Sequence, residues 1–151
     1  ARLDAVWQAM ESTEAADLWL SAMVALIGSD AFFRHHDSGD LQSSDHLDKI
    51  AWIARELPNI LFWLPTKEYT LVHRWLMNND KPVNLIIRPS APMIDGPAVP
   101  LQTRDGQPLP VAYVHLNKAP QARVCPAPSQ DGKCKDCRTC WTDENVSYAW
   151  H

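Results

Sequence analysis

The sequence predicts an α/β protein with a parallel sheet, followed by a proline-rich extension that carries a four-cysteine metal site. Three observations support this fold class. Between residues 31 and 88, apolar segments of strand length alternate with amphipathic segments of helical length, in the order β-α-β-α-β. Nine of the twelve prolines then fall between Pro89 and Pro128. All four cysteines lie between Cys125 and Cys140.

The first segment, residues 3–27, is expected to form one helix or two. Its apolar residues recur at helical spacing, and they are Leu3, Val6, Trp7, Met10, Leu18, Met23, Leu26 and Ile27. An oxygen of Ser12 or Thr13 can cap a second helix, and Gly28 can end it. Because the chain begins directly with a helix, the expectation is that a segment preceded it and that the chain is an N-terminally incomplete fragment.

Three apolar segments are expected to be buried strands, at residues 31–36, 59–64 and 83–88. Two helices lie between them, the first from Ser43 or Ser44 to Leu57 and the second over residues 68–77. The apolar stripe of the first helix consists of Leu47, Ile50, Ala51, Ala54 and Leu57. Since parallel neighbours need a crossover connection, this alternation predicts parallel strands covered by helices.

The chain changes character after Arg88. Turn signals occur at Asp95-Gly96 and Asp105-Gly106, and strands are expected at residues 111–116 and 146–150. The proline-rich part is interpreted either as a surface excursion or as a lid over a site. Residues 1–151 are expected to form a single α/β domain, in which residues 1–88 are the core with the N-terminal helices and residues 89–151 are the extension.

The extension contains Cys125, Cys134, Cys137 and Cys140, of which the last three form a C-x2-C-x2-C run. A C-x2-C turn brings two thiolates close enough to bind one metal, and a third cysteine at the same step adds a third ligand. Four soft thiolates suit Zn²⁺ or an iron–sulfur cluster. Structural zinc sites usually show two separated C-x2-C pairs, so this spacing favours a 4Fe–4S cluster, with zinc as the alternative. Free core thiols would be scattered along the chain, and disulfides would need an oxidising compartment.

A second candidate site lies where the three predicted strands end. In parallel α/β sheets, ligands gather beyond the carboxyl ends of the strands, an edge that we call the rim. The residues expected to bind a small molecule there are His36, Asp37, Asp40, Lys67 and Arg88. Histidine near aspartate can form a metal site or an acid/base pair. The alternative is that Asp37 and Ser38 form a turn and that one histidine of the pair His35 and His36 packs inward.

The composition limits the partners. The net charge is −4, from 14 basic and 18 acidic residues, so the chain lacks the basic excess of a nucleic-acid-binding protein. The one basic cluster, formed by Lys133, Lys135 and Arg138, flanks the cysteines and can offset the charge of thiolate ligands. No apolar run approaches the length of a membrane span, and no targeting segment is visible, so we expect a cytoplasmic protein. The sequence does not specify the oligomeric state.

The chain resembles the phage gene product 88 family over most of residues 31–151. Its distinctive motifs are the SGD turn at 38–40, the P-x-x-x-F-W-L-P-T-K segment at 58–67 and the terminal C-x2-C-x2-C-W. The order of strands and loops in this family is similar to the partial barrel of radical S-adenosylmethionine enzymes. The resemblance therefore implies a partial parallel (β/α) barrel-like sheet and a protein encoded by a phage and acting in the host cell. Radical enzymes carry a C-x3-C-x2-C motif near the start of the barrel, whereas no cysteine precedes Cys125 here.

Three functions follow as hypotheses. The first is a phage iron–sulfur protein whose four cysteines bind the cluster, with a small-molecule site at the rim. If catalytic, it would be a radical S-adenosylmethionine-like enzyme or a degenerate relative. The second is a zinc-stapled structural or interaction protein without catalysis, in which the metal folds the proline-rich part. The third, a nucleic-acid-modifying enzyme, rests on the phage resemblance alone.

Overall fold

The computed structural model describes residues 13–36 and 39–150. The first half of the described chain forms a three-stranded parallel sheet in the order β1-β2-β3. Its elements are α2 (Thr13–Ile27), β1 (Phe32–Arg34), α3 (Ser44–Glu56), β2 (Leu61–Thr66), α4 (Tyr69–Asn78) and β3 (Leu85–Pro89). The predicted parallel β-α-β-α-β arrangement is confirmed. The part of the predicted N-terminal helix that covers residues 3–12 lies outside the described residues.

Local sequence signals explain where α3 begins and how it connects to the sheet. The Ser43 hydroxyl accepts a hydrogen bond from the amide of His46 at 3.1 Å, which satisfies one of the open amides of the first turn. The predicted apolar stripe of α3 is buried up to Ala54, and Leu57 is half-buried. After the helix, the side-chain amide of Asn84 lies 2.8 Å from the Ala54 carbonyl and thereby ties the end of α3 to the start of β3.

The second half of the chain forms another parallel sheet, in the order β4-β6-β5. Its strands are β4 (Ala112–His115), β5 (Arg123–Val124) and β6 (Val146–Ala149). A bridge between Ser90 and Ala112 joins this sheet to the end of β3, and the amide of Ala91 donates to the Ala112 carbonyl at 2.6 Å. The predicted strands around residues 111–116 and 146–150 are confirmed, whereas β5 was not predicted.

The parallel α/β part of the predicted fold class is confirmed, whereas the two sheets do not close into a barrel within the described residues. Only β1, β2 and β3 are joined by α-helices. The described connections among β4, β5 and β6 contain loops and two short 3-10 helices, η1 (Ala127–Gln130) and η2 (Thr139–Trp141). Without crossover helices the second sheet lacks the outer layer that a (β/α) barrel repeats around its circumference.

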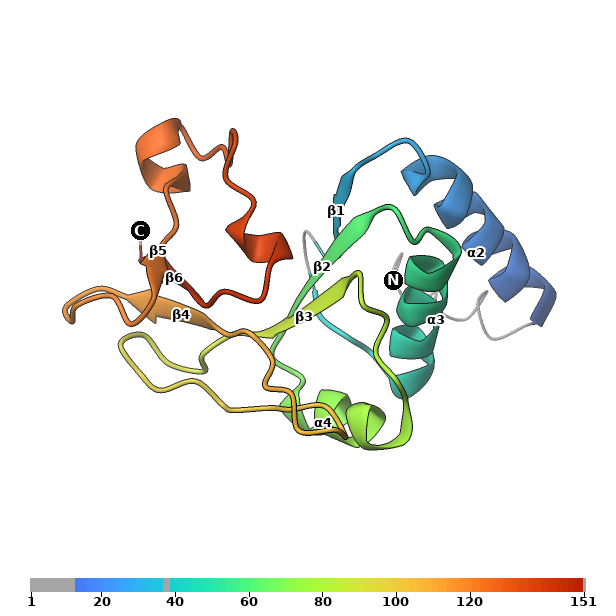
Figure 1. Cartoon of the computed structure of the whole chain (residues 1–151), viewed down its shortest axis with the longest axis horizontal. Coiled ribbons are helices and arrows are strands. Elements are labelled where there is room, and N and C mark those ends of the chain that lie inside the picture. The colour runs from blue at the N-terminus through green and yellow to red at the C-terminus, as the bar shows by residue number, and fades with distance from the viewer. Residues whose placement is uncertain (1–12, 37–38, 151) are drawn as a thin grey trace.

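The first sheet has two differently covered faces (Figure 1). On one face Phe62, Leu64, Leu85 and Ile87 pack with the apolar sides of α3 and α4 to form the main core. The opposite face, which we call the second face, carries Phe32, Arg34, Trp63, Ile86 and Arg88. The polypeptide of residues 125–145, the cysteine segment, covers this face instead of a helix.

Helix α2 packs against α3 through Trp19, Leu20, Met23 and Val24, which are partly buried on the core. Its outer side exposes Leu18 and Leu26. Among the described helices, none combines the length and the apolar character that crossing a membrane requires.

Candidate functional site

The cysteine segment brings its four thiols around one small space. Cys125 follows β5 directly, and its amide donates to the Ser147 carbonyl of β6 at 2.9 Å. The other three cysteines return on the loop that leads into η2. All four side chains line a single pocket of about 10 Å³ together with Trp141. None of them is in a disulfide.

The thiols are neighbours, but they are not in the close arrangement of a preformed single-ion site. Among residues 13–36 and 39–150, no three histidine, cysteine, aspartate or glutamate side chains are placed to hold a metal ion. The predicted four-cysteine site is thus seen as a shared pocket and not as a formed coordination shell. The donor set itself fits a metal that prefers sulfur, since all four thiols line this pocket.

The environments of the four sulfur atoms differ. Cys140 is buried, and its Sγ lies 3.1 Å from the Tyr148 hydroxyl. Burial raises the pKa of Cys140 and also that of Cys125. By contrast, the hydroxyl of Thr139, 3.5 Å from the Cys137 sulfur, lowers the pKa of Cys137, and Arg123 and Arg138 add to this effect. The segment therefore contains one thiol whose pKa is lowered beside two whose pKa values are raised.

Arg88 supplies a positive charge from the sheet and holds the cysteine segment in place. Its side chain is fully buried on the second face. The two terminal nitrogens donate to five main-chain carbonyls at 2.7 to 3.4 Å, those of Val111, Thr139, Cys140, Thr142 and Glu144. Burial lowers the pKa of Arg88, while Cys140 and Tyr148 act in the opposite direction. Arg88 thus lies at the junction between β3 and the last cysteine.

Trp141 provides the second attachment of the segment. Its indole packs edge-on against Phe32 and Trp63, with ring centroids 5.6 and 5.3 Å away. The guanidinium of Arg138 lies over the Phe32 ring at 5.0 Å. These contacts fix the cysteine segment on β1 and β2 through aromatic packing.

The structure brings together only part of the predicted rim. Asp40 lies at the carboxyl end of β2, where its carboxylate accepts hydrogen bonds from the Thr66 hydroxyl at 2.6 Å and the Lys67 amide at 2.7 Å. The same carboxylate accepts from the amide of Leu41. Asp40 and Lys67 are therefore neighbours, but the contact uses the main chain of Lys67. Asp37 lies outside the described residues.

Arg88 is not part of an exposed rim. The sequence placed it at the end of a strand over residues 83–88, but β3 runs from Leu85 to Pro89. Because Arg88 is inside the strand, its side chain must point to one face of the sheet, and the cysteine segment covers that face. The predicted grouping of Arg88 with Asp40 and Lys67 is corrected accordingly.

Histidines gather at the end of β1, including one that the sequence did not single out. His35 packs inward on Phe62, with 6% of its surface exposed, and its Nε2 has no hydrogen-bond partner. The ring of His36 lies 5.3 Å from that of His46 on α3. Burial lowers the pKa of His35 to about 3 and that of His46 to about 4, and it also lowers the pKa of His36. In the sequence, His46 could have been recognised as a candidate site residue only because it is a polar residue next to the apolar stripe of α3.

The described contacts of the cysteine segment with the first sheet are with Phe32, Trp63 and Arg88 on the second face and with the main-chain carbonyl of Phe33. No described contact joins the segment to Asp40 or Lys67. The described contacts therefore attach the segment to the sheet and not to Asp40 or Lys67.

These features define a parallel α/β protein whose second sheet face is covered by a cysteine-bearing segment. The family model described as Gene product 88 matches residues 1–143, and the chain belongs to this phage family. Neither the curated proteins nor the solved structures contain a match to the chain. The further likeness to radical S-adenosylmethionine enzymes is not shown by these comparisons.

Proposed function

We propose that this phage protein binds a metal centre through Cys125, Cys134, Cys137 and Cys140, with a 4Fe–4S cluster as the favoured occupant. The observation that carries the proposal is the convergence of all four thiols of the chain on one small pocket. Eight residues separate Cys125 from Cys134, and a strand lies directly before the first cysteine. Free thiols have no reason to converge in this way, whereas metal ligands must.

The surroundings of the thiols suit a negatively charged centre. Four thiolates need compensating charge, and Arg88, Arg123 and Arg138 each favour the ionised form of a cysteine in the segment. The hydroxyls of Thr139 and Tyr148 lie beside the sulfurs of Cys137 and Cys140. Hydrogen bonds to the sulfur ligands and burial are among the factors that set the properties of iron–sulfur centres.

The choice between a cluster and zinc depends on the spacing of the cysteines. No three of the thiols in the described residues are placed to hold one ion, which favours neither occupant. The space between them, about 10 Å³, is close to that of one water-sized sphere and suits a single ion. We favour the cluster because three cysteines at successive x2 steps with one distant cysteine match cluster-binding patterns better than zinc patterns. Zinc that staples the segment without catalysis is the second candidate.

The proposed role of the metal is to hold the cysteine segment on the second face, and no reaction is assigned to it. A small molecule at the rim is not included, because both oxygens of Asp40 are used within the protein and Arg88 faces the other way. The proposal is thus a metal-binding protein in which the metal completes the fold.

The test is elemental analysis and visible absorption of the protein after anaerobic purification. Iron and sulfide near four per chain, with visible absorbance, would support the cluster. One zinc per chain with no colour would support the zinc alternative, and neither metal would overturn the proposal. Single Cys→Ser variants should each lose the metal. The matched control is Asp131→Asn, an exposed position in the same segment whose left-handed backbone asparagine tolerates.

A further inference from the structure

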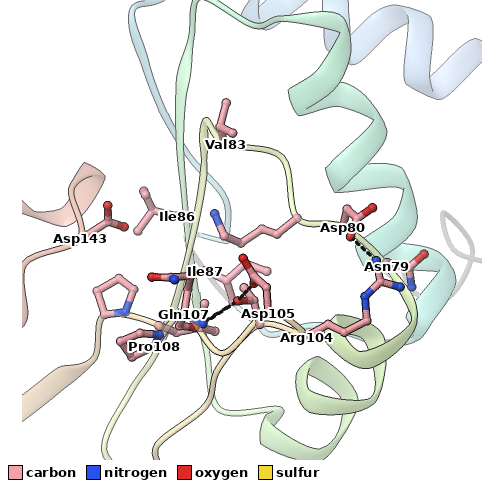
Figure 2. A pocket seen from close by; sticks show the side chains of 14 residues that line it. Asn79, Asp80, Val83, Ile86, Ile87, Arg104, Asp105, Gln107, Pro108 and Asp143 are labelled. Carbon is pink, nitrogen blue, oxygen red and sulfur yellow. Dashed lines mark hydrogen bonds and ion pairs between the residues drawn. The ribbon is translucent and has the colours of Figure 1, made fainter.

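A large cavity lies at the edge of the sheet opposite the rim. It has a volume of about 690 Å³, within the range of roughly 300–1,000 Å³ that is usual for small-molecule sites. Its walls come from three segments: residues 79–87, which lead into and include part of β3, residues 103–110 before β4, called the excursion, and Asp143 before β6 (Figure 2). The cysteines and the rim residues do not line it.

The cavity has an apolar floor. Ile86 lines it from the second face of the sheet, Ile87 and Leu109 line it from the main-core side, and all three are buried. Pro108 and Pro110 add further apolar surface. The excursion is held in place by an antiparallel bridge between Gln102 and Pro108. An aliphatic group of a ligand would therefore be placed against a preformed apolar surface.

The polar wall opposite this floor is also fixed. Arg104 of the excursion forms an ion pair with Asp80, at the end of α4, with 2.7 Å between Nη2 and Oδ1 (Figure 2). The guanidinium of Arg55 donates to the carbonyl of the same Asp80 at 2.8 Å. Arg104 and Asp80 are exposed and their charges offset each other, so the unpaired charges of the cavity are the groups left to recognise a ligand.

Asp105 also lines the cavity, and its carboxylate accepts a hydrogen bond from the Thr103 hydroxyl. Besides it, two opposite charges in the cavity have capacity for further bonds. Nζ of Lys81 donates to the carbonyls of Leu85 at 2.8 Å and Pro82 at 3.2 Å, and an ammonium has a third N–H. Asp143 is exposed, and among the described residues no hydrogen bond or ion pair reaches its carboxylate. Burial lowers the pKa of Lys81, and the negative charge of Asp143 acts in the opposite direction. The two charges therefore interact electrostatically without forming an ion pair.

We propose that the cavity binds a zwitterionic small molecule with an apolar body, of the chemical class of an apolar amino acid or short peptide. Its carboxylate accepts a hydrogen bond from the free N–H of Lys81, its ammonium donates to Asp143, and its aliphatic part lies against Ile86. A polyamine would match Asp143 but would place positive charge beside Lys81. A simple carboxylic acid would match Lys81 but leave Asp143 without a partner. The proposal does not depend on the metal centre.

The experiment is isothermal titration of the full chain, as purified with any metal it contains. The probes are L-leucine and L-leucyl-L-leucine, which distinguish an amino acid from a peptide. Leucinamide lacks the carboxylate, N-acetyl-leucine lacks the ammonium, and putrescine is the dication control. We expect one of the two zwitterions to bind, and each of the modified compounds to bind at least about tenfold more weakly, as for loss of a charge-assisted hydrogen bond.

Two variants connect the binding to the proposed residues. Asp143→Asn, at an exposed position, should reduce affinity for the zwitterion about tenfold while leaving the affinity for N-acetyl-leucine unchanged. Lys81→Met should also reduce the affinity for the zwitterion about tenfold, but it should leave the affinity for leucinamide unchanged. Lys67→Met at the rim and Asp30→Asn before β1 are matched controls outside the cavity. Failure of both zwitterions to bind, tighter binding of putrescine, or equal affinity in Asp143→Asn and the unmodified protein would each overturn the proposal.

Discussion

The indole Nε1 of Trp141 donates a hydrogen bond to the main-chain carbonyl of Phe33 at 3.0 Å, although 108 positions separate the two residues. This contact connects the first strand of the sheet to the residue after the last cysteine. It also shows that the cysteine segment is part of the packed structure and is not a mobile tail. The stability of the first sheet and that of the segment should therefore depend on each other.

Replacing Trp141 with phenylalanine should keep most of the aromatic packing but remove this hydrogen bond. We expect the free energy of unfolding to fall by about 1 kcal/mol, the usual net value of such a bond. Urea denaturation followed by tryptophan fluorescence measures the change. Trp52→Phe, at a partly exposed position of α3, is the matched control. A larger loss in the control than in Trp141→Phe would contradict the importance of this contact.

Replacing Arg88 with methionine should be much more damaging. The change leaves carbonyls of the cysteine segment and Val111 without their donor in a buried place, and each such group costs about 1–3 kcal/mol. We expect a loss of at least about 3 kcal/mol in urea denaturation. Arg88→Lys retains a charge with three donors, so its free energy of unfolding should lie between that of Arg88→Met and that of the unmodified protein. An Arg88→Met protein as stable as the unmodified one would show that the five contacts contribute little.

Asp40 and Lys67 separate a structural role from a binding role. Asp40→Asn should destabilise the protein by about 1–2 kcal/mol, because one of its oxygens becomes an N–H donor facing other donors. Lys67→Met should leave the free energy of unfolding nearly unchanged, since only its main chain contacts Asp40. Urea denaturation tests both variants. If Asp40→Asn has unchanged stability but abolishes binding of a metabolite in a thermal-shift screen, the rim is a ligand site after all.

Acid should destabilise the protein through the buried histidines. The pKa of His35 is lowered from 6.5 to about 3, so below pH 6.5 the unfolded chain binds a proton that the folded protein excludes. The contribution of neutral His35 to the free energy of unfolding is therefore fully present above pH 6.5. As the pH drops towards 3, the free energy of unfolding falls by about 1.4 kcal/mol per pH unit for each excluded proton. His35→Phe should flatten this slope by about one proton in urea titrations between pH 7 and 4. The matched substitution His73→Phe on the exposed side of α4 is the control. An unchanged slope in His35→Phe would assign the acid sensitivity to other groups.

Removal of the proposed metal should release the cysteine segment before the rest unfolds. Bound structural metal can contribute on the order of 10 kcal/mol to folding, and the segment contains few apolar residues to replace that contribution. Limited trypsin digestion after chelation or oxidation should cut first at Lys133, Lys135 and Arg138. Cleavage at Lys49 and Arg55 in α3 should come later. Simultaneous cleavage of both regions would contradict a local role of the metal.

The sequence predicted the first sheet well because its information is local. Continuous apolar strands, a capping serine before α3 and the apolar stripe from Leu47 to Ala54 each depend on residues close in the chain. Parallel pairing then follows from the need for crossover helices. The second sheet was only partly predicted, because β5 has two exposed residues and is defined by its pairing with β6.

The positions of the polar residues were harder to predict. Arg88 looks like a rim residue in the sequence, and only the distant carbonyls between Val111 and Glu144 reveal that it is buried. The cavity beside Lys81 and Asp143 could not be predicted either, because its walls come from three separated segments. Long-range partners of this kind leave no spacing pattern in a single sequence.

The five carbonyl partners of Arg88 have a consequence for synthesis of the protein. They lie between residues 111 and 144, so during translation the guanidinium on β3 has none of them when its own strand emerges. The β-α-β-α-β half can assemble early from neighbouring segments, but its second face stays open to water until residue 144 has left the ribosome. A stalled or shortened product would therefore expose Trp63 and Ile86 together with an unpaired arginine, a surface prone to aggregation and accessible to proteases.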